Sequence, residues 1–215
     1  MKRISQGILI VCCAAFFITC KQVEPQSDTG ADYFPVAIGQ TKVFSVDSIT
    51  YAPFTGKKDS VRTYLKETIT EETSDSNGFK IFRTERYISS DTSKGWSYTG
   101  DFFYYSNQYL INIVDGNITT TAFVIPVTKN RKWNINLYNQ KEQVFASYNS
   151  VNSPFGIYPD CTEALINEDI NDIEESVNKS IFARNKGLVC KIFSDIKFEN
   201  SKRNGQYTIT KLLER

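Results

Sequence analysis

The chain has 215 residues, with 25 Lys and Arg, 24 Asp and Glu and no histidine, and its formal net charge is +1. This balance leaves no basic excess that would hold nucleic acid. Without histidine, the chain has no Ser-His-Asp or Cys-His catalytic group and no imidazole ligand for zinc or iron.

The first 19 residues have the pattern of a secretory signal peptide. Lys2 and Arg3 form a basic start, and the run from Gly7 to Ile18 is apolar and uncharged. This run is shorter than the roughly 20 apolar residues of a membrane-spanning helix and has the length of a signal-peptide core. Cys20 follows where cleavage is expected, so the segment resembles the signal peptide of a bacterial lipoprotein.

We therefore expect cleavage before Cys20 and attachment of lipid to that cysteine. The usual lipoprotein motif has Leu three positions before the cysteine and a small residue just before it, whereas this chain has Phe17 and Thr19. One alternative is modification of Cys12 or Cys13, before which the apolar core is too short. The other is an uncleaved anchor, for which the run lacks spanning length.

Residues 20–32 are expected to form a lipidated cysteine followed by a flexible tether. The tether is expected because these residues have no hydrophobic pattern beyond Val23. Residues 33–215 then form one domain, a length that suits a single hydrophobic core. Cys161 and Cys190 are the two cysteines of this domain, too few for a cysteine-rich metal site. We expect no metal and no cofactor.

Alternation of apolar and polar residues with a period of two dominates the domain and predicts β-strands. Asn77-Gly78 and Asp115-Gly116 mark hairpin turns, and 185–187 and 204–205 are further turn candidates. The predicted strands are 42–51, 60–70, 79–88, 95–105, 108–114, 117–125, 132–138, 142–149, 158–167, 177–183, 187–198 and 206–213. The stretch 162–177 has a short helix as its alternative.

The connections are short and no long helices separate the strands, so parallel β-α-β units are not expected. About eleven or twelve antiparallel strands in one domain must curl or split to protect their edges. The predicted fold class is all-β. The first choice is a strongly curved sheet, from half-barrel to barrel, and the alternative is a two-sheet sandwich.

Three stretches of the domain are similar to motifs of β-rich lipoproteins of Bacteroidota. They are Tyr33–Pro35 with Gly39, Gly156–Cys161 (GIYPDC) and Phe182–Val189 (FARNKGLV). The resemblance implies an all-β lipoprotein domain. It brings no known activity, because that group is itself largely uncharacterised.

Residues 95–105 (GWSYTGDFFYY) contain the main candidate for a ligand site. Alternation along one strand would place Trp96, Tyr98, Phe102 and Tyr104 on one face, where they would stack a sugar or line an apolar cup. The same pattern is typical of a strand that packs in a core, which is the interpretation we favour.

Cys161 and Cys190 stand in a predicted meander of three antiparallel strands. Its turns would place Cys190 opposite Ile181 and Cys161 opposite Ala183, so the two cysteines are two strand spacings, or about 9.5 Å, apart. That exceeds the roughly 7 Å between the α-carbons of a disulfide. We predict two free, buried thiols, with a disulfide as the alternative in an oxidising compartment.

These features lead us to expect a non-catalytic, lipid-anchored domain of the cell envelope that binds an apolar ligand or an envelope protein. No Asp or Glu stands in an apolar, site-like context, so we expect no enzyme. The alternative function is a surface glycan-binding module that uses the Trp96 platform. Lys21-Gln22 lacks the acidic run that resembles a surface-export signal, so we favour the periplasmic face of the bacterial outer membrane.

Overall fold

The computed structural model describes residues 28–139, 142–151, 157–199 and 202–213. The expected signal peptide, Cys20 and the first part of the tether lie outside the described residues. Within these residues, twelve antiparallel strands form one sheet, and a short 3-10 helix, η2 (Ala31–Tyr33), precedes them. The strands are β1 (Thr41–Tyr51), β2 (Lys58–Ser74), β3 (Lys80–Ser89), β4 (Ser97–Ser106), β5 (Leu110–Asp115), β6 (Ile118–Val124), β7 (Lys132–Asn134), β8 (Phe145–Val151), β9 (Cys161–Ile170), β10 (Glu174–Ala183), β11 (Gly187–Glu199) and β12 (Lys202–Leu212).

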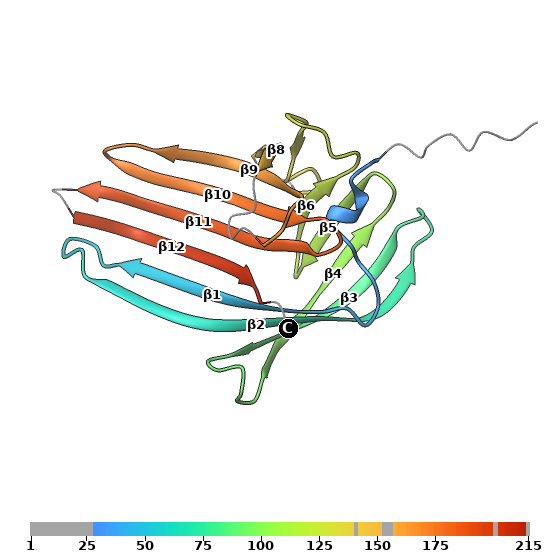
Figure 1. Cartoon of the computed structure of the whole chain (residues 1–215), viewed down its shortest axis with the longest axis horizontal. Coiled ribbons are helices and arrows are strands. Elements are labelled where there is room, and N and C mark those ends of the chain that lie inside the picture. Colours follow the sequence, from blue (N-terminus) through green and yellow to red (C-terminus); the bar gives the residue numbers. More distant parts are fainter. Residues whose placement is uncertain (1–27, 140–141, 152–156, 200–201, 214–215) are drawn as a thin grey trace, which may run out of the picture.

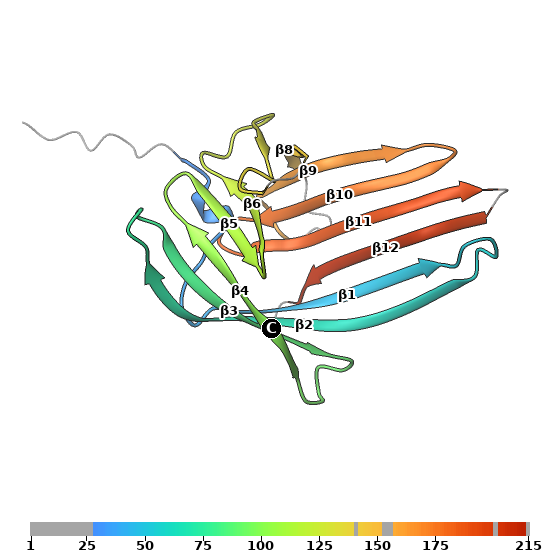
Figure 2. The ribbon, with the colours of Figure 1, turned by 180° about the vertical axis from the view of Figure 1, so that it is seen from behind.

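Two six-stranded meanders make up the sheet. Strands β1–β6 and β7–β12 each pair in chain order, and β1 pairs with β12 to join the two halves. Figures 1 and 2 show that β9–β12, β1 and β2 run side by side as long strands, whereas β4 and β5 cross them at an angle. The sheet is therefore strongly curved, and it nearly closes into a barrel.

The two edge strands, β6 and β7, meet at a seam that side chains help to close. The backbone N–H of Thr121 donates to the carbonyl of Ile135 (2.9 Å), and the indole N–H of Trp133 donates to the carbonyl of Thr121 (3.0 Å). The buried Tyr148 hydroxyl donates to the carbonyl of Val124 and accepts from its N–H, both at 2.8 Å. These bonds occupy backbone groups that an open edge would leave unpaired.

We expect Tyr148→Phe to lower the free energy of unfolding by about 2–4 kcal/mol. Without the hydroxyl, both backbone groups of the buried Val124 lose their partner, and each such group costs about 1–3 kcal/mol. Chemical denaturation followed by circular dichroism measures the change. Tyr109→Phe is the matched control, because Tyr109 is 61% exposed and its variant should differ by less than about 0.5 kcal/mol. Equal stability of the two variants would show that the seam does not need Tyr148.

The N-terminal segment fills the end of the barrel at which the chain enters. The Phe34 ring lies 5.5 Å from that of Tyr104 and 5.6 Å from that of Phe123, measured between centroids. Phe182 of β10 lies 5.5 Å from the same ring. Both Phe34 and Tyr33 belong to the main cluster of buried residues, so the core depends on residues that precede the first strand.

A second buried cluster packs on the other face of β10. Because side chains alternate along a strand, Ile181 and Ala183 point away from the core that contains Phe182. They pack with a further set of side chains that are at most 7% exposed: Tyr158, Cys161, Val189 and Cys190.

The predicted all-β class and the strongly curved sheet are confirmed. Each of the twelve predicted strands overlaps a strand of the structure, which forms one curved sheet and not the alternative sandwich. Residues 162–177, for which a short helix is the alternative prediction, form parts of β9 and β10 and the turn between them. The predicted register is also confirmed, because Cys190 pairs with Ile181 and Cys161 with Ala183.

Cys161 and Cys190 are buried and unpaired in the structure, on strands that β10 separates. Burial raises the pKa of the Cys190 thiol to about 11 and also raises the pKa of the Cys161 thiol, so little reactive thiolate forms at neutral pH. We expect a thiol reagent to react slowly with the native mature protein and to count two thiols after denaturation without reductant. A count of zero would establish a disulfide.

Candidate functional site

The four aromatic residues singled out in the sequence do not share one face. Tyr98 lies opposite Tyr87, but the register then shifts by one residue before Gly100, whose φ is 141°. Such a bulge reverses the facing of the residues that follow. Phe102, 1% exposed, and Tyr104 point into the barrel, whereas Tyr98 is 55% exposed on the other face. The expectation of one shared face is wrong.

This division separates core residues from surface residues. The rings of Phe102 and Tyr104 pack against each other at 5.0 Å and belong to the interior. Tyr98 packs edge-on against a neighbouring tyrosine ring. Trp96 lies just before β4 and lines an open groove, with the ammonium of Lys66 5.1 Å from its ring centroid. The four residues therefore form no flat stacking platform.

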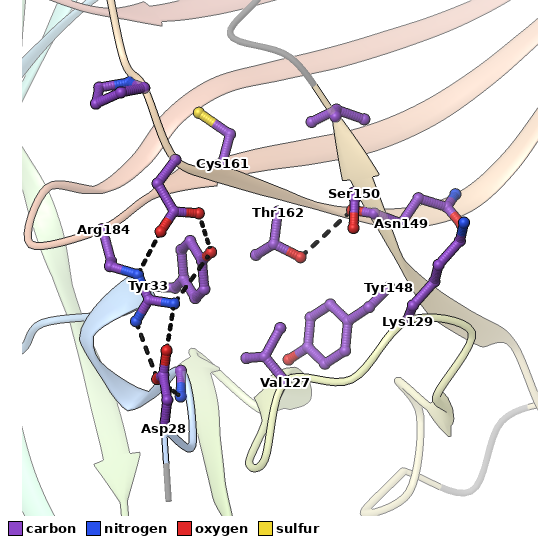
Figure 3. Close-up of a pocket in the computed structure, with 14 residues that line it drawn as sticks. Asp28, Tyr33, Val127, Lys129, Tyr148, Asn149, Ser150, Cys161, Thr162 and Arg184 are labelled. Atoms are coloured by element: carbon purple, nitrogen blue, oxygen red, sulfur yellow. Dashed lines mark hydrogen bonds and ion pairs between the residues drawn. The ribbon is translucent and has the colours of Figure 1, made fainter.

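Arg184, which follows β10, holds the N-terminal segment against the barrel (Figure 3). Its guanidinium makes ion pairs with Asp28 at 2.7 Å and with Asp160 at 2.6 Å. It makes a third ion pair with Asp32, at 2.7 Å. The ring of Tyr33 lies 4.5 Å from the guanidinium, and its hydroxyl donates a hydrogen bond to Asp160. We call these five residues the Arg184 clamp.

Four residues of the clamp have pKa values shifted in the direction that keeps them paired: Asp28, Asp160, Tyr33 and Arg184. The hydrogen bonds from Arg184 lower the pKa of Asp28. The bonds from Tyr33 and Arg184 lower the pKa of Asp160. Burial, together with the bond to Asp160, raises the pKa of Tyr33 to about 12, and the carboxylates raise the pKa of Arg184. The clamp therefore stays intact at neutral pH.

A polar pocket of about 300 Å³ opens beside the clamp, with Lys129, Ser150 and Thr162 in its lining (Figure 3).

The clamp also extends the domain on the N-terminal side of residue 33, where the sequence predicts that it begins. Residues 28–32 fall within the tether that the sequence predicts, yet Asp28 and Asp32 are bound to the barrel. The contacts of the domain therefore extend back to Asp28.

An apolar hollow of about 840 Å³ lies at the same end of the barrel, and we call it the mouth hollow. Residues 34–38 (FPVAI) line one part of it, and the β4–β5 turn with Tyr109 lines another. Ile38 and Tyr109 are 59% and 61% exposed. Its charged lining residues, Glu72 and Lys80, neutralise each other in an ion pair of 2.9 Å. The volume is within the range of sites for small ligands.

A network of charges reaches from the barrel interior to the surface and does not have the layout of a glycoside hydrolase. Arg86 contacts two carboxylates, that of Glu67 at 3.2 Å and that of Asp115 at 2.9 Å. Burial raises the pKa of Glu67, and Arg86 opposes the rise. Glycoside hydrolysis needs open space for the sugar between two carboxylates, and here a guanidinium joins them. We read the group as a structural ion-pair network.

The residues that the structure describes contain no cluster of three or more Cys, Asp or Glu that could hold a metal ion. No helix in this part of the chain has the length and apolar character needed to cross a membrane.

No protein-family model matches the chain, and no curated protein matches it. Among solved structures, it is similar to a protein of Parabacteroides distasonis ATCC 8503 described as a "putative lipoprotein", with a TM-score of 0.43 and 12% sequence identity. The similarity covers 84% of this chain and 96% of that one. That protein is from the Bacteroidota, as are the lipoproteins that the sequence motifs resemble. At this TM-score the likeness carries no argument about function.

Proposed function

We propose that this chain is a lipoprotein of the bacterial outer membrane, anchored through lipid on Cys20 and facing the periplasm. We further propose that its β domain is a non-catalytic module that binds an apolar ligand in the mouth hollow. The signal-peptide pattern before Cys20 supports the anchor. The mouth hollow supports the binding role, because it leaves apolar side chains of considerable size exposed to water.

The anchor and the mouth hollow belong to the same end of the domain. Asp28 is held by the clamp, and the next residue, Thr29, lines the hollow. Cys20 precedes Asp28 by eight residues, which span at most about 28 Å when fully extended. A lipid on Cys20 therefore keeps the hollow close to the membrane, and this closeness favours the acyl chain of a membrane lipid as the ligand.

The packing of the barrel limits how such a ligand would bind. Phe34 and its aromatic neighbours fill the interior behind the hollow. An acyl chain would therefore lie at the mouth, along residues 34–38, and would not enter the centre of the barrel. Such a site would contact part of a lipid and leave the remainder in the membrane.

Photo-crosslinking in cells tests the proposal with the full-length protein. We expect p-benzoylphenylalanine in place of Ile38 to give a lipid adduct, detected by mass spectrometry of the purified chain. The matched control is the same substitution at Ile173, which is 69% exposed but lies in the β9–β10 turn, at the opposite end of the long strands (Figure 1). We expect no lipid adduct there.

Other outcomes would overturn the lipid ligand. A protein adduct of one defined size at position 38 would show that an envelope protein occupies the hollow. Equal adducts at both positions, or none at position 38, would show that the hollow is not a binding site. None of these outcomes bears on whether Cys20 carries lipid, so the two parts of the proposal can fail separately.

A further inference from the structure

The mouth hollow has a polar part beside its apolar one. Residues 34–38 supply apolar side chains, whereas Glu72 of β2, Lys80 of β3 and residues 106–108 at the end of β4 are polar. Because β2, β3 and β4 are neighbouring strands, these polar groups lie together. A pocket with an apolar surface and a few polar groups fixes the orientation of a ligand that has both kinds of surface.

A β-bulge turns Glu72 into the hollow. The pairing of β2 with β3 shifts by one residue between Ile69 and Glu71. Ile69 is buried, so regular alternation would turn Glu71 inward and Glu72 outward. The bulge reverses this, because Glu72 pairs with Phe82, which is 3% exposed and also lines the hollow. The position of this carboxylate is therefore a specific feature of β2.

Lys80 places a positive charge next to Glu72. It stands two residues before Phe82 on β3, so its side chain is on the same face of the sheet. Its ammonium lies 2.9 Å from the Glu72 carboxylate, and the side chains of Lys80 and Glu72 are 63% and 35% exposed. Within the described lining, these two residues carry the charge. The hollow therefore presents one charge of each sign and no net charge.

The exposed pair can exchange its partners for those of a ligand. Exposed ion pairs contribute little to stability, so their exchange costs little. An anionic ligand would pair with Lys80 but would take this partner from Glu72 and place a negative charge beside it. A zwitterionic ligand gives both groups a partner. A primary ammonium also donates charge-assisted hydrogen bonds to a carboxylate, whereas a quaternary ammonium has no N–H to donate.

We propose that the mouth hollow binds a phospholipid whose zwitterionic headgroup carries a phosphate and a primary ammonium. The phosphate lies at Lys80, the ammonium lies at Glu72, and an acyl chain lies along residues 34–38. This inference rests on the proposed function, since it names the class of lipid that the hollow takes.

Photo-crosslinking in vesicles of defined composition tests the headgroup. The lipidated protein with p-benzoylphenylalanine in place of Ile38 is inserted into vesicles that contain equal amounts of phosphatidylethanolamine, phosphatidylcholine and phosphatidylglycerol with identical acyl chains. The mass of each adduct identifies its headgroup. We expect the phosphatidylethanolamine adduct to exceed each of the others by about threefold or more, the ratio that one additional exposed charge pair gives.

Variants separate recognition of the headgroup from closeness to the membrane. We expect Glu72→Gln to remove the preference for phosphatidylethanolamine over phosphatidylglycerol, because the hollow then carries only the positive charge of Lys80. Glu71→Gln is the matched control, since Glu71 is exposed and pairs with Arg83 on the other face of the sheet. It should keep the preference. Lys80→Met should lower the yields of all three adducts by about threefold, with circular dichroism spectra unchanged in every variant.

The headgroup and the binding role of the hollow can fail separately. Equal yields of the three adducts would overturn the zwitterionic headgroup while the hollow still binds lipid. A preference that survives Glu72→Gln, or that Glu71→Gln removes equally, would do the same. If position 38 gives no lipid adduct in these vesicles, the binding role of the hollow is overturned and the headgroup proposal falls with it.

Discussion

Phe34→Ala is expected to lower the free energy of unfolding by about 3–5 kcal/mol, the usual cost of removing a buried phenyl ring. Phe34 is 8% exposed and contacts the rings of Tyr104, Phe123 and Phe182. These rings come from strands far apart in the sequence, so the cavity would lie where β4, β6 and β10 meet. Urea denaturation followed by circular dichroism measures the loss.

Phe54→Ala is the control for the loss of a phenyl ring. Phe54 stands in the β1–β2 turn and is 89% exposed, so its removal should change stability by less than about 0.5 kcal/mol. If Phe34→Ala were as stable as Phe54→Ala, the segment before β1 would not be part of the core. The mouth hollow, which that segment lines, would then lose its structural basis.

Cys20→Ala is expected to release the protein from the membrane or to leave it as an unprocessed precursor. Without the thiol, the lipid has no point of attachment, and each acyl methylene contributes about 0.8 kcal/mol to membrane binding. Fractionation of cells, followed by immunoblotting of the membrane and soluble fractions, measures the distribution and the size of the product.

Two further variants identify which cysteine carries the lipid. Cys12→Ala and Cys13→Ala should still give an anchored protein, because both residues lie in the part that cleavage removes. A Cys20→Ala protein that is cleaved at the expected site and yet remains with the membrane would refute the lipid assignment.

The strands were predictable from sequence because apolar and polar residues alternate along each of them. In β11, Cys190, Ile192 and Ile196 face one side and Lys191 and Lys197 the other, and short turns then determine which residues pair. The register of β9, β10 and β11 follows from their turns. Closure of the barrel is not local, since it depends on side chains such as Tyr148 that reach a strand distant in the chain.

The candidate sites were less predictable, for two physical reasons. The bulge before Gly100 separates Tyr98 from Phe102, and a single extra residue leaves no mark on an alternating pattern. Arg184 and Asp28 of the clamp are more than 150 residues apart in the chain. No local sequence motif therefore predicts that they meet.

The mass of the intact protein extracted from the outer membrane tests the central claim most directly. We predict a chain that begins at Cys20 and carries the mass of a diacylglyceryl group on sulfur and one further acyl group on the N-terminal nitrogen. After proteolysis, these groups should be found on the N-terminal peptide. A chain that begins elsewhere, or an unmodified Cys20 in the membrane-bound protein, would contradict the account of a lipid-anchored domain.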